Sequence, residues 1–321
     1  MILPEFIESM NRLGQEKVPF LFMVDFEMVN PVIMRLDEVD PKEILYSIQG
    51  FSNSSRTNAG RIRIDKSPGS LLDYKKKFDR VLAHLEYGDT FLTNLTVTTE
   101  VTLSCSLRDI FYQSEAKYKL LYKNQFLVFS PETFVQIKDG KIYAFPMKGT
   151  IDASIENANE KILSDKKELA EHVTIVDLIR NDLSQVASRV NVTRFRYVDE
   201  VRTGEKNLLQ VSSEVCGDLD KDYKNYLGSI LLKLLPAGSV SGAPKPKTLE
   251  IIRAVEEEVR GYYTGVFGYF NGKDLDSGVM IRFIENRAGK YFYRSGGGIT
   301  TQSDVESEYQ ETIDKVYVPV A

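Results

Sequence analysis

The C-terminal third of the chain contains three apolar runs that are separated by very short turns. The runs cover Tyr262 to Phe270, Leu275 to Glu285 and Lys290 to Ser295, and the turns are Asn271-Gly272 and Arg287-Ala288-Gly289. Asn-Gly pairs and short turns with glycine are typical of hairpins, whereas a crossover between parallel strands is much longer. The pattern therefore predicts an antiparallel meander, and the fold must contain a sheet that accepts it.

The rest of the chain alternates between strand-like and helix-like patterns in no regular order. Helical spacing of apolar residues predicts helices over 3–17, 70–85, 161–186, 223–235, 247–260 and a last one after Ser303. Strand patterns cover 18–32, 90–103, 126–129, 134–137, 141–145, 190–201 and 208–213, and 51–60 has the polar composition of a surface loop. Because strands and helices do not alternate one by one, we expect an α+β fold rather than a doubly wound sheet.

Length and composition bound the class of protein. The chain has 321 residues and a formal charge of −5, so it can bury a sizeable core and gives no electrostatic reason to expect nucleic acid or an anionic membrane as a partner. Its two cysteines form no disulfide framework or zinc spacing, and the first residues lack the pattern of a signal peptide. No apolar run reaches the ~18–20 residues of a membrane span. These features indicate a cytoplasmic enzyme or binding protein.

A lysine stands directly after one of the predicted strands. The stretch Tyr143 to Thr150 is an apolar, aromatic run that reaches Pro146 and then continues Met147-Lys148-Gly149. The pattern predicts a strand that stops and turns, with Lys148 at its end. Taken alone, such a lysine is a surface charge, because lysine is seldom buried without a partner. Lys148 becomes a candidate nucleophile only when distant segments are considered with it.

Two predicted helices carry glutamates three residues apart. Glu168 and Glu171 share a face of one helix, and Glu308 and Glu311 share a face of the last helix. Such pairs are either solvated helix faces or a clamp for Mg²⁺, which prefers carboxylates and keeps some water.

Three further features could bind an anion. Gly296-Gly297-Gly298 would expose backbone N–H groups in a loop, or serve only as a tight connection. Arg282 lies within an apolar strand and therefore needs a carboxylate partner, from the protein or from a ligand. The loop Gly238 to Lys245 is similar to a phosphate-binding loop, but Ala243-Pro244 stands where Lys-Ser/Thr is required, which argues against nucleotide binding.

Several long motifs, taken together, resemble the chorismate-utilising enzymes. They are Ser130-Pro131-Glu132-Thr133-Phe134, PMKGT at 146–150, AEHVTIVDLIRNDL at 170–183, PAGSVSGAPK at 236–245, YTGVFGYF at 263–270, SGGGIT at 295–300 and ESEYQETIDK at 306–315. Within the family, a lysine before the Gly-Thr of the PMKGT motif is similar to the aminodeoxychorismate synthases, component I, whereas anthranilate and salicylate synthases typically have alanine there.

The resemblance implies a fold, a domain and a set of site residues. It implies an α+β fold of large antiparallel sheets around a central active site with helices outside, as a single domain over 1–321 with a chorismate-binding core over 90–318 and a divergent, shortened part over 1–89. By resemblance, Mg²⁺ is held by Glu171 and Glu311, with Glu168 and Glu308 behind them. The other implied residues are Lys148 as nucleophile, Glu132 for proton transfer, and Arg282, Tyr263, Ser241, Gly296, Gly297, Gly298, Lys315 and Thr150 around the substrate.

The implied reaction replaces the ring hydroxyl of chorismate by an amino group from ammonia. The chain has no glutaminase signature, so the ammonia is expected from a separate glutamine amidotransferase subunit. Two alternatives stay open: anthranilate synthase component I or another chorismate-utilising enzyme, and a non-catalytic chorismate-binding subunit. One departure from the family concerns Gln210, which stands where the family often has a histidine, and this puts an acid role at that position in doubt. A tryptophan-binding motif is not evident in the N-terminal part.

Overall fold

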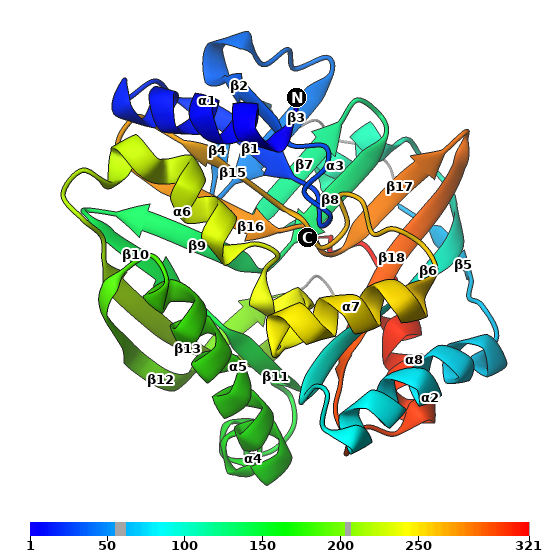
Figure 1. Ribbon diagram of the computed structural model, residues 1–321. Helices are drawn as coiled ribbons and strands as arrows, with labels where there is room; N and C mark the ends of the chain where they lie inside the picture. Colours follow the sequence, from blue (N-terminus) through cyan, green and yellow to red (C-terminus); the bar gives the residue numbers. More distant parts are fainter. Residues whose placement is uncertain (55–61, 203–206, 321) are drawn as a thin grey trace.

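The computed structural model describes residues 1–54, 62–202 and 207–320 and contains two antiparallel sheets with helices on their outer sides (Figure 1). Each sheet has nine strands. The α+β class and the large antiparallel sheets predicted from the sequence are therefore confirmed.

The first sheet has the order β11-β13-β10-β9-β16-β15-β1-β2, with β12 paired to β13. Its strands are β1 (Phe20–Val24), β2 (Val32–Arg35), β9 (Thr133–Lys138), β10 (Lys141–Ala144), β11 (Met147–Asp152), β12 (Ser188–Arg202), β13 (Asn207–Asp218), β15 (Val266–Phe270) and β16 (Leu275–Val279). The second sheet has the order β14-β6-β18-β17-β8-β7-β3-β4, with β5 paired to β6. Its strands are β3 (Ile44–Ile48), β4 (Phe51–Ser52), β5 (Ile64–Ser67), β6 (Leu92–Leu103), β7 (Tyr118–Tyr122), β8 (Phe126–Ser130), β14 (Gly242–Ala243), β17 (Phe283–Arg287) and β18 (Lys290–Ile299).

Eight α-helices lie in the described part of the chain. They are α1 (Leu3–Gln15), α2 (Leu71–Tyr87), α3 (Leu107–Gln113), α4 (Ala158–Ser164), α5 (Lys166–Ser184), α6 (Leu227–Leu234), α7 (Lys245–Glu256) and α8 (Val305–Asp314). Short 3₁₀ turns cover 36–38, 223–226 and 238–240. No helix of the described residues is long and apolar enough to cross a membrane.

The core lies on both faces of the first sheet, and β1 is apolar and buried at every position. In β1, Phe20, Phe22 and Val24 pack under α1 and α6, while Leu21 and Met23 point to the opposite face. There they meet aromatic residues of the second sheet, so the two sheets pack against each other. Side chains alternate between the faces of a strand, which explains why a continuous apolar run is needed here.

The predicted C-terminal meander is wrong in one respect, because its strands belong to two sheets. β15 and β16 pair in the first sheet, and β17 and β18 pair in the second. The expected strand Leu275 to Glu285 is broken after Val279, and Arg282 has a φ of 54°. The chain therefore passes from one sheet to the other at Met280–Arg282, and Arg282 lies in this crossing rather than within a strand.

The glycines Gly296–Gly298 form no loop, in contrast to the prediction. They belong to β18 and pair with Thr96, Leu95 and Asn94 of β6. Small residues are needed there for a steric reason: a Cβ on Gly297 would lie 3.2 Å from the Glu308 carboxylate, and one on Gly296 would lie 2.6 Å from a backbone oxygen.

Three helix boundaries also differ from the prediction. The helix expected over 161–186 is divided into α4 and α5 at Asp165, whose side chain accepts a hydrogen bond from the Glu168 N–H and so caps α5. α7 ends at Glu256, four residues before the expected Arg260. The last helix, expected directly after Ser303, begins at Val305 and is capped by Asp304, whose side chain accepts a hydrogen bond from the Ser307 N–H. Of the loop predicted over 51–60, residues 55–60 lie outside the described residues.

Candidate functional site

Lys148 is the second residue of β11, which forms the edge of the first sheet. Its pairing with β13 shifts register between Met147 and Thr150, and Gly149 has a φ of 87°. This positive φ favours glycine, and a Cβ at Gly149 would also lie 3.0 Å from the Glu168 carboxylate. The irregular backbone after Pro146 therefore brings Lys148 toward α5 instead of continuing β10.

Two lysine–glutamate ion pairs face each other across the site. Lys148 Nζ lies 2.6 Å from Glu171 Oε2 on α5, and Lys315 Nζ lies 2.6 Å from Glu311 Oε1 on α8. Lys315 also donates to the Gly296 carbonyl of β18. Glu311 contributes to the charge environment of Lys148, so the carboxylates of both helices act on one site.

The pKa of Lys148 results from opposing effects. Burial lowers it, but the Glu171 carboxylate and the charges of Glu168 and Glu311 more than offset burial, so the pKa is raised above its ordinary value. Lys148 is therefore held as a cation when only protein groups surround it.

A cavity of about 250 Å³ opens beside these ion pairs. The predicted site residues that line it are Glu132, Lys148, Glu171 and Gly298. Its other polar lining comes from Thr174 of α5, from Ser239 and from the segment Thr300–Gln302 between β18 and α8. The cavity thus lies between residues of both sheets and α5, with the segment that precedes α8 on its border.

Glu132 is positioned by the turn between β8 and β9. Its carboxylate accepts a hydrogen bond from the Ser239 hydroxyl. Burial raises the pKa of Glu132, while the Ser239 hydrogen bond and the charges of Arg282 and Lys315 act in the opposite direction. Because the net pKa is raised, Glu132 keeps a proton at higher pH than an ordinary glutamate, as a proton donor requires.

Arg282 lies in the crossing between the two sheets and makes no ion pair with any described residue. Its Nε–H is buried without a hydrogen-bond partner among these residues, and its guanidinium lies 5.4 Å from the centre of the Tyr317 ring. A buried guanidinium in this state is suited to a carboxylate ligand. The sequence allowed a carboxylate partner either from the protein or from a ligand. Among the described residues, the protein provides no carboxylate that pairs with Arg282.

Tyr263 is buried in the turn that precedes β15, near Arg282. Burial raises the pKa of its hydroxyl to about 12, and the charges of Arg260, Arg294 and Arg282 oppose this rise. The hydroxyl therefore stays protonated at neutral pH and can donate a hydrogen bond.

Of the eight residues expected around the substrate, only Gly298 lines the cavity, and the other seven do not. Ser241 is fully buried and its hydroxyl donates to the Ala237 carbonyl, so it closes its own loop. Thr150 is exposed and pairs with Gln210 of β13. The hydroxyl next to Glu132 belongs instead to Ser239, two residues earlier, which the prediction missed although it lies in the same PAGSVSGAPK motif.

His172 was also missed as a site residue because one histidine on a helix has no distinctive pattern. It is fully buried behind Lys148, next to Glu171 in sequence, and its Nε2 lies 2.7 Å from the Ser213 hydroxyl. Ser213 also accepts from the Arg196 N–H, and its own N–H donates to the Pro146 carbonyl. A buried polar chain thus joins α5 to the backbone that carries Lys148.

The donor set fits a hard cation only in part. Among the described residues no group of three or more His, Cys, Asp or Glu side chains is close enough to form a closed cage. Mg²⁺ does not require one, since it is commonly held by one or two carboxylates together with water and substrate oxygens. Glu171 and Glu311, each now neutralised by a lysine, are carboxylates of this kind, so the residues present are compatible with Mg²⁺.

Comparisons with known proteins indicate the family of this chain. Residues 36–321 match the family described as chorismate binding enzyme. An uncharacterized PabA-like protein of Pasteurella multocida is 47% identical, with both chains covered in full. Aminodeoxychorismate synthase component 1 of Salmonella typhimurium is 31% identical over 76% of this chain and 56% of that protein. The structure of anthranilate synthase component I from Streptococcus pneumoniae has a TM-score of 0.65 and 27% identity, over 79% of this chain and 58% of that one.

The family match spans more than half of the chain, and its residues include the cavity and both glutamate pairs. The chain therefore belongs to the chorismate-binding enzyme family.

Proposed function

We propose that this protein is an aminodeoxychorismate synthase component I, which converts chorismate and ammonia to 4-amino-4-deoxychorismate. The observation that carries the proposal is Lys148, which lines the cavity and contacts Glu171 directly. Lys148 is not an ordinary surface charge, because its side chain points toward α5 and pairs with Glu171 there. The 31% identity to an aminodeoxychorismate synthase component supports the same activity.

Lys148 acts as the nucleophile. Its neutral amine attacks ring carbon 2 of chorismate, the two ring double bonds shift by one position each, and the bond from carbon 4 to the hydroxyl breaks. Ammonia then attacks carbon 4, the double bonds shift back, and the bond between carbon 2 and Lys148 breaks. Two steps replace one difficult displacement, which is the advantage of covalent catalysis.

Glu132 supplies the proton that the leaving hydroxyl needs. Its raised pKa and its place in the cavity suit this role, and the Ser239 hydroxyl fixes its orientation. The hydroxyl leaves as water, and Glu132 can take up a proton from the incoming ammonia.

Two separate groups hold the carboxylates of chorismate. Arg282 and Tyr263 would bind the pyruvyl carboxylate through the guanidinium and the protonated hydroxyl. Mg²⁺ held by Glu171 and Glu311, with Glu168 and Glu308 behind, would offset the charge of the ring carboxylate. Lys148 must release Glu171 before it can act, because the ion pair keeps the amine charged.

A mass measurement tests the covalent step. Wild-type protein incubated with chorismate and Mg²⁺, without ammonia, should carry chorismate minus water on the peptide that contains Lys148. Lys148→Ala should show no such adduct. Lys141→Ala, which removes a lysine that is about half exposed on β10, should retain it. An adduct-free wild type together with near-normal product from Lys148→Ala would exclude this mechanism.

The nitrogen source gives a second test. The protein alone should use ammonia and not glutamine, and addition of a glutamine amidotransferase subunit should confer glutamine use. We place this reaction in the cytoplasm, where the amidotransferase would supply ammonia. Glutamine-dependent product from the isolated chain would contradict the assigned partner.

Anthranilate synthesis is the second candidate, supported by the likeness to an anthranilate synthase component I structure. The product distinguishes the two reactions. Fluorescent anthranilate from chorismate and ammonium would favour this candidate, whereas aminodeoxychorismate would favour the first.

A further inference from the structure

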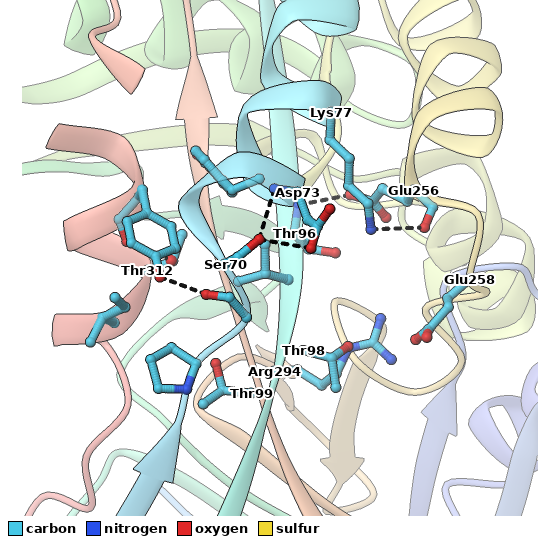
Figure 2. Close-up of a pocket in the computed structure, with 16 residues that line it drawn as sticks. Ser70, Asp73, Lys77, Thr96, Thr98, Thr99, Glu256, Glu258, Arg294 and Thr312 are labelled. Carbon is cyan, nitrogen blue, oxygen red and sulfur yellow. Dashed lines mark hydrogen bonds between the residues drawn. The ribbon is translucent and has the colours of Figure 1, made fainter. Parts of the chain in front are cut away.

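A second cavity, of about 190 Å³, lies beside α8, where Thr312 points toward it (Figure 2). Tyr309 and Thr312 of α8 line it, whereas Glu311 of the same helix pairs with Lys315 in the first site. The remaining walls come from the start of α2 and the residues before it, from β6, from the end of α7 and from Arg294 of β18. The volume is below the ~300–1,000 Å³ of sites for drug-sized ligands, so only a small molecule fits.

Part of the wall is an open strand edge. On the edge of β6 that faces away from β18, β14 pairs at residues 92–93 and β5 pairs at residues 100–103. Between them, the N–H groups of Asn94 and Thr96 bond to Ser241 and to Glu256. Because alternate peptide groups of a strand point to the same edge, the N–H and C=O of Thr98 point into the gap that the cavity occupies.

Two buried side chains of the lining have polar atoms that no described residue satisfies. Tyr74 and Arg294 are each 3% exposed, and the Tyr74 hydroxyl and the Arg294 Nε–H have no hydrogen-bond partner in the described part of the chain. A buried donor without an acceptor is costly, so both groups favour an oxygen-bearing molecule beside them.

The lining of this cavity contains three acidic residues, Asp73, Glu256 and Glu258, and two basic residues, Lys77 and Arg294. Each acidic residue of the lining already contacts a basic one: Asp73 pairs with Lys76, Glu256 with Arg260, and Glu258 with Arg287. The Arg294 guanidinium donates a hydrogen bond to the Glu285 carboxylate. The Lys77 ammonium donates to the Glu256 backbone carbonyl. Lys77 forms no ion pair with any described residue and is therefore the lining cation that can accept an anion. Val97 and Ile313 provide an apolar surface for the rest of the molecule.

We propose that this cavity is a second binding site, for a small organic carboxylate whose charged end meets Lys77 and Arg294. The apolar part of the ligand lies against Val97 and Ile313, and the Tyr74 hydroxyl donates to a ligand oxygen. Because Tyr309, Thr312 and Ile313 of α8 line the cavity, a bound carboxylate contacts the helix that carries Glu308 and Glu311. This second consequence rests on the proposed function, whereas the binding site itself does not.

Benzoate is a suitable probe, and its binding to metal-free protein can be measured by ligand-observed NMR titration. We expect Lys77→Gln and Tyr74→Phe each to weaken binding at least threefold. Lys75→Gln and Tyr87→Phe, matched changes at exposed positions of the same helix, should bind as the wild type does. Undetectable binding by wild type, or equal binding by Lys77→Gln and Lys75→Gln, would overturn the proposal.

A further variant separates the two cavities. If benzoate occupies the first cavity instead, Lys148→Met should weaken binding and Lys77→Gln should not, and this result would also overturn the second site. Saturating benzoate should change the KM for chorismate at least twofold in wild type but not in Lys77→Gln. A constant KM despite binding would refute the action through α8, and binding by a protein with no synthase activity would refute only the proposed function.

Discussion

The two lysine–glutamate pairs of the candidate site have the same length but different surroundings. Lys148–Glu171 and Lys315–Glu311 both measure 2.6 Å. Burial lowers the pKa of each lysine, yet the pKa of Lys148 ends above its ordinary value and that of Lys315 below it. The cause is the wider charge environment: Glu168 and Glu311 also stabilise the charged form of Lys148, whereas Arg282 and Lys148 destabilise that of Lys315.

The comparison shows that a short ion pair does not by itself determine how firmly a lysine holds its proton. The neighbouring charges decide it, at a distance where Coulomb interactions are still strong in a partly buried site. Lys315 is further fixed by the Gly296 carbonyl, so we assign it to substrate positioning and Lys148 to the chemistry. Chemistry at Lys148 then requires a change around Glu171, because the present arrangement keeps the amine protonated.

The largest expected effect separates the two lysines by turnover. Lys148→Ala should lower kcat for aminodeoxychorismate by about a thousandfold or more, because the covalent route is lost. Lys315→Ala should act mainly on KM for chorismate, with a loss of kcat/KM of about 10- to 100-fold. Steady-state kinetics with ammonium as the nitrogen source would measure both. Equal losses of kcat in the two variants would contradict the division of roles.

The two glutamates come next in size. Glu171→Gln and Glu311→Gln each remove a charged oxygen from a site with few neutral substitutes, and activity should fall by about two orders of magnitude or more with a weaker dependence on Mg²⁺. Lys233→Gln, a change on α6 outside this site, should leave the Mg²⁺ titration unchanged. Wild-type turnover at low Mg²⁺ by either glutamate variant would refute the carboxylate clamp.

The sequence predicted the components of this comparison but not their pairing. Lys148, Glu171, Lys315 and Glu311 were identified from motifs, and the large antiparallel sheets were expected as well. The Lys148–Glu171 pair depends on side-chain directions across 23 residues of chain, which no local pattern records, whereas the Lys315–Glu311 pair is a contact between residues four apart at the end of one helix. The same reason explains Ser239, which lies beside Glu132 only after its loop folds against the turn between β8 and β9.

The errors in the predicted fold have a similar physical origin. The crossing at Met280–Arg282 interrupts an apolar run that is indistinguishable from one long strand, because both halves face buried surfaces. The three consecutive glycines of β18 predicted a loop. In the structure glycine is needed there because Glu308 and the backbone of β6 approach closely. In both places long-range packing outweighs the local preference.

The order of proton loss provides a smaller effect that tests the comparison directly. In metal-free protein, Lys315 should lose its proton at lower pH than Lys148, since the pKa of the first is lowered and that of the second is raised. NMR of ¹³C-methylated lysines, assigned with Lys148→Arg and Lys315→Arg, would follow both titrations. Titration of Lys148 before Lys315 would reverse the assignment of the two environments.

The smallest expected effect concerns His172, whose contact with Ser213 links α5 to the backbone that carries Lys148. Lys315 has no such histidine and is held by the Gly296 carbonyl instead. Burial, assisted by the charge of Arg196, lowers the pKa of His172 to about 4, against ~6.5 in an unfolded chain. Between these values the unfolded state binds the proton and the folded state does not, so stability increases as the pH rises through this window.

His172→Gln should remove this contribution, which amounts to at most about 1.4 kcal/mol per pH unit. Urea unfolding of metal-free protein between pH 4.5 and 6.5 would therefore show a smaller slope of the unfolding free energy against pH for His172→Gln than for wild type. His84→Gln, a change at the half-exposed second histidine of the chain, serves as the control and should follow the wild type. Parallel curves for His172→Gln and wild type would show that the ring is not held neutral behind Lys148, and the support that distinguishes the Lys148 side would then have to come from Ser213 and the Pro146 backbone alone.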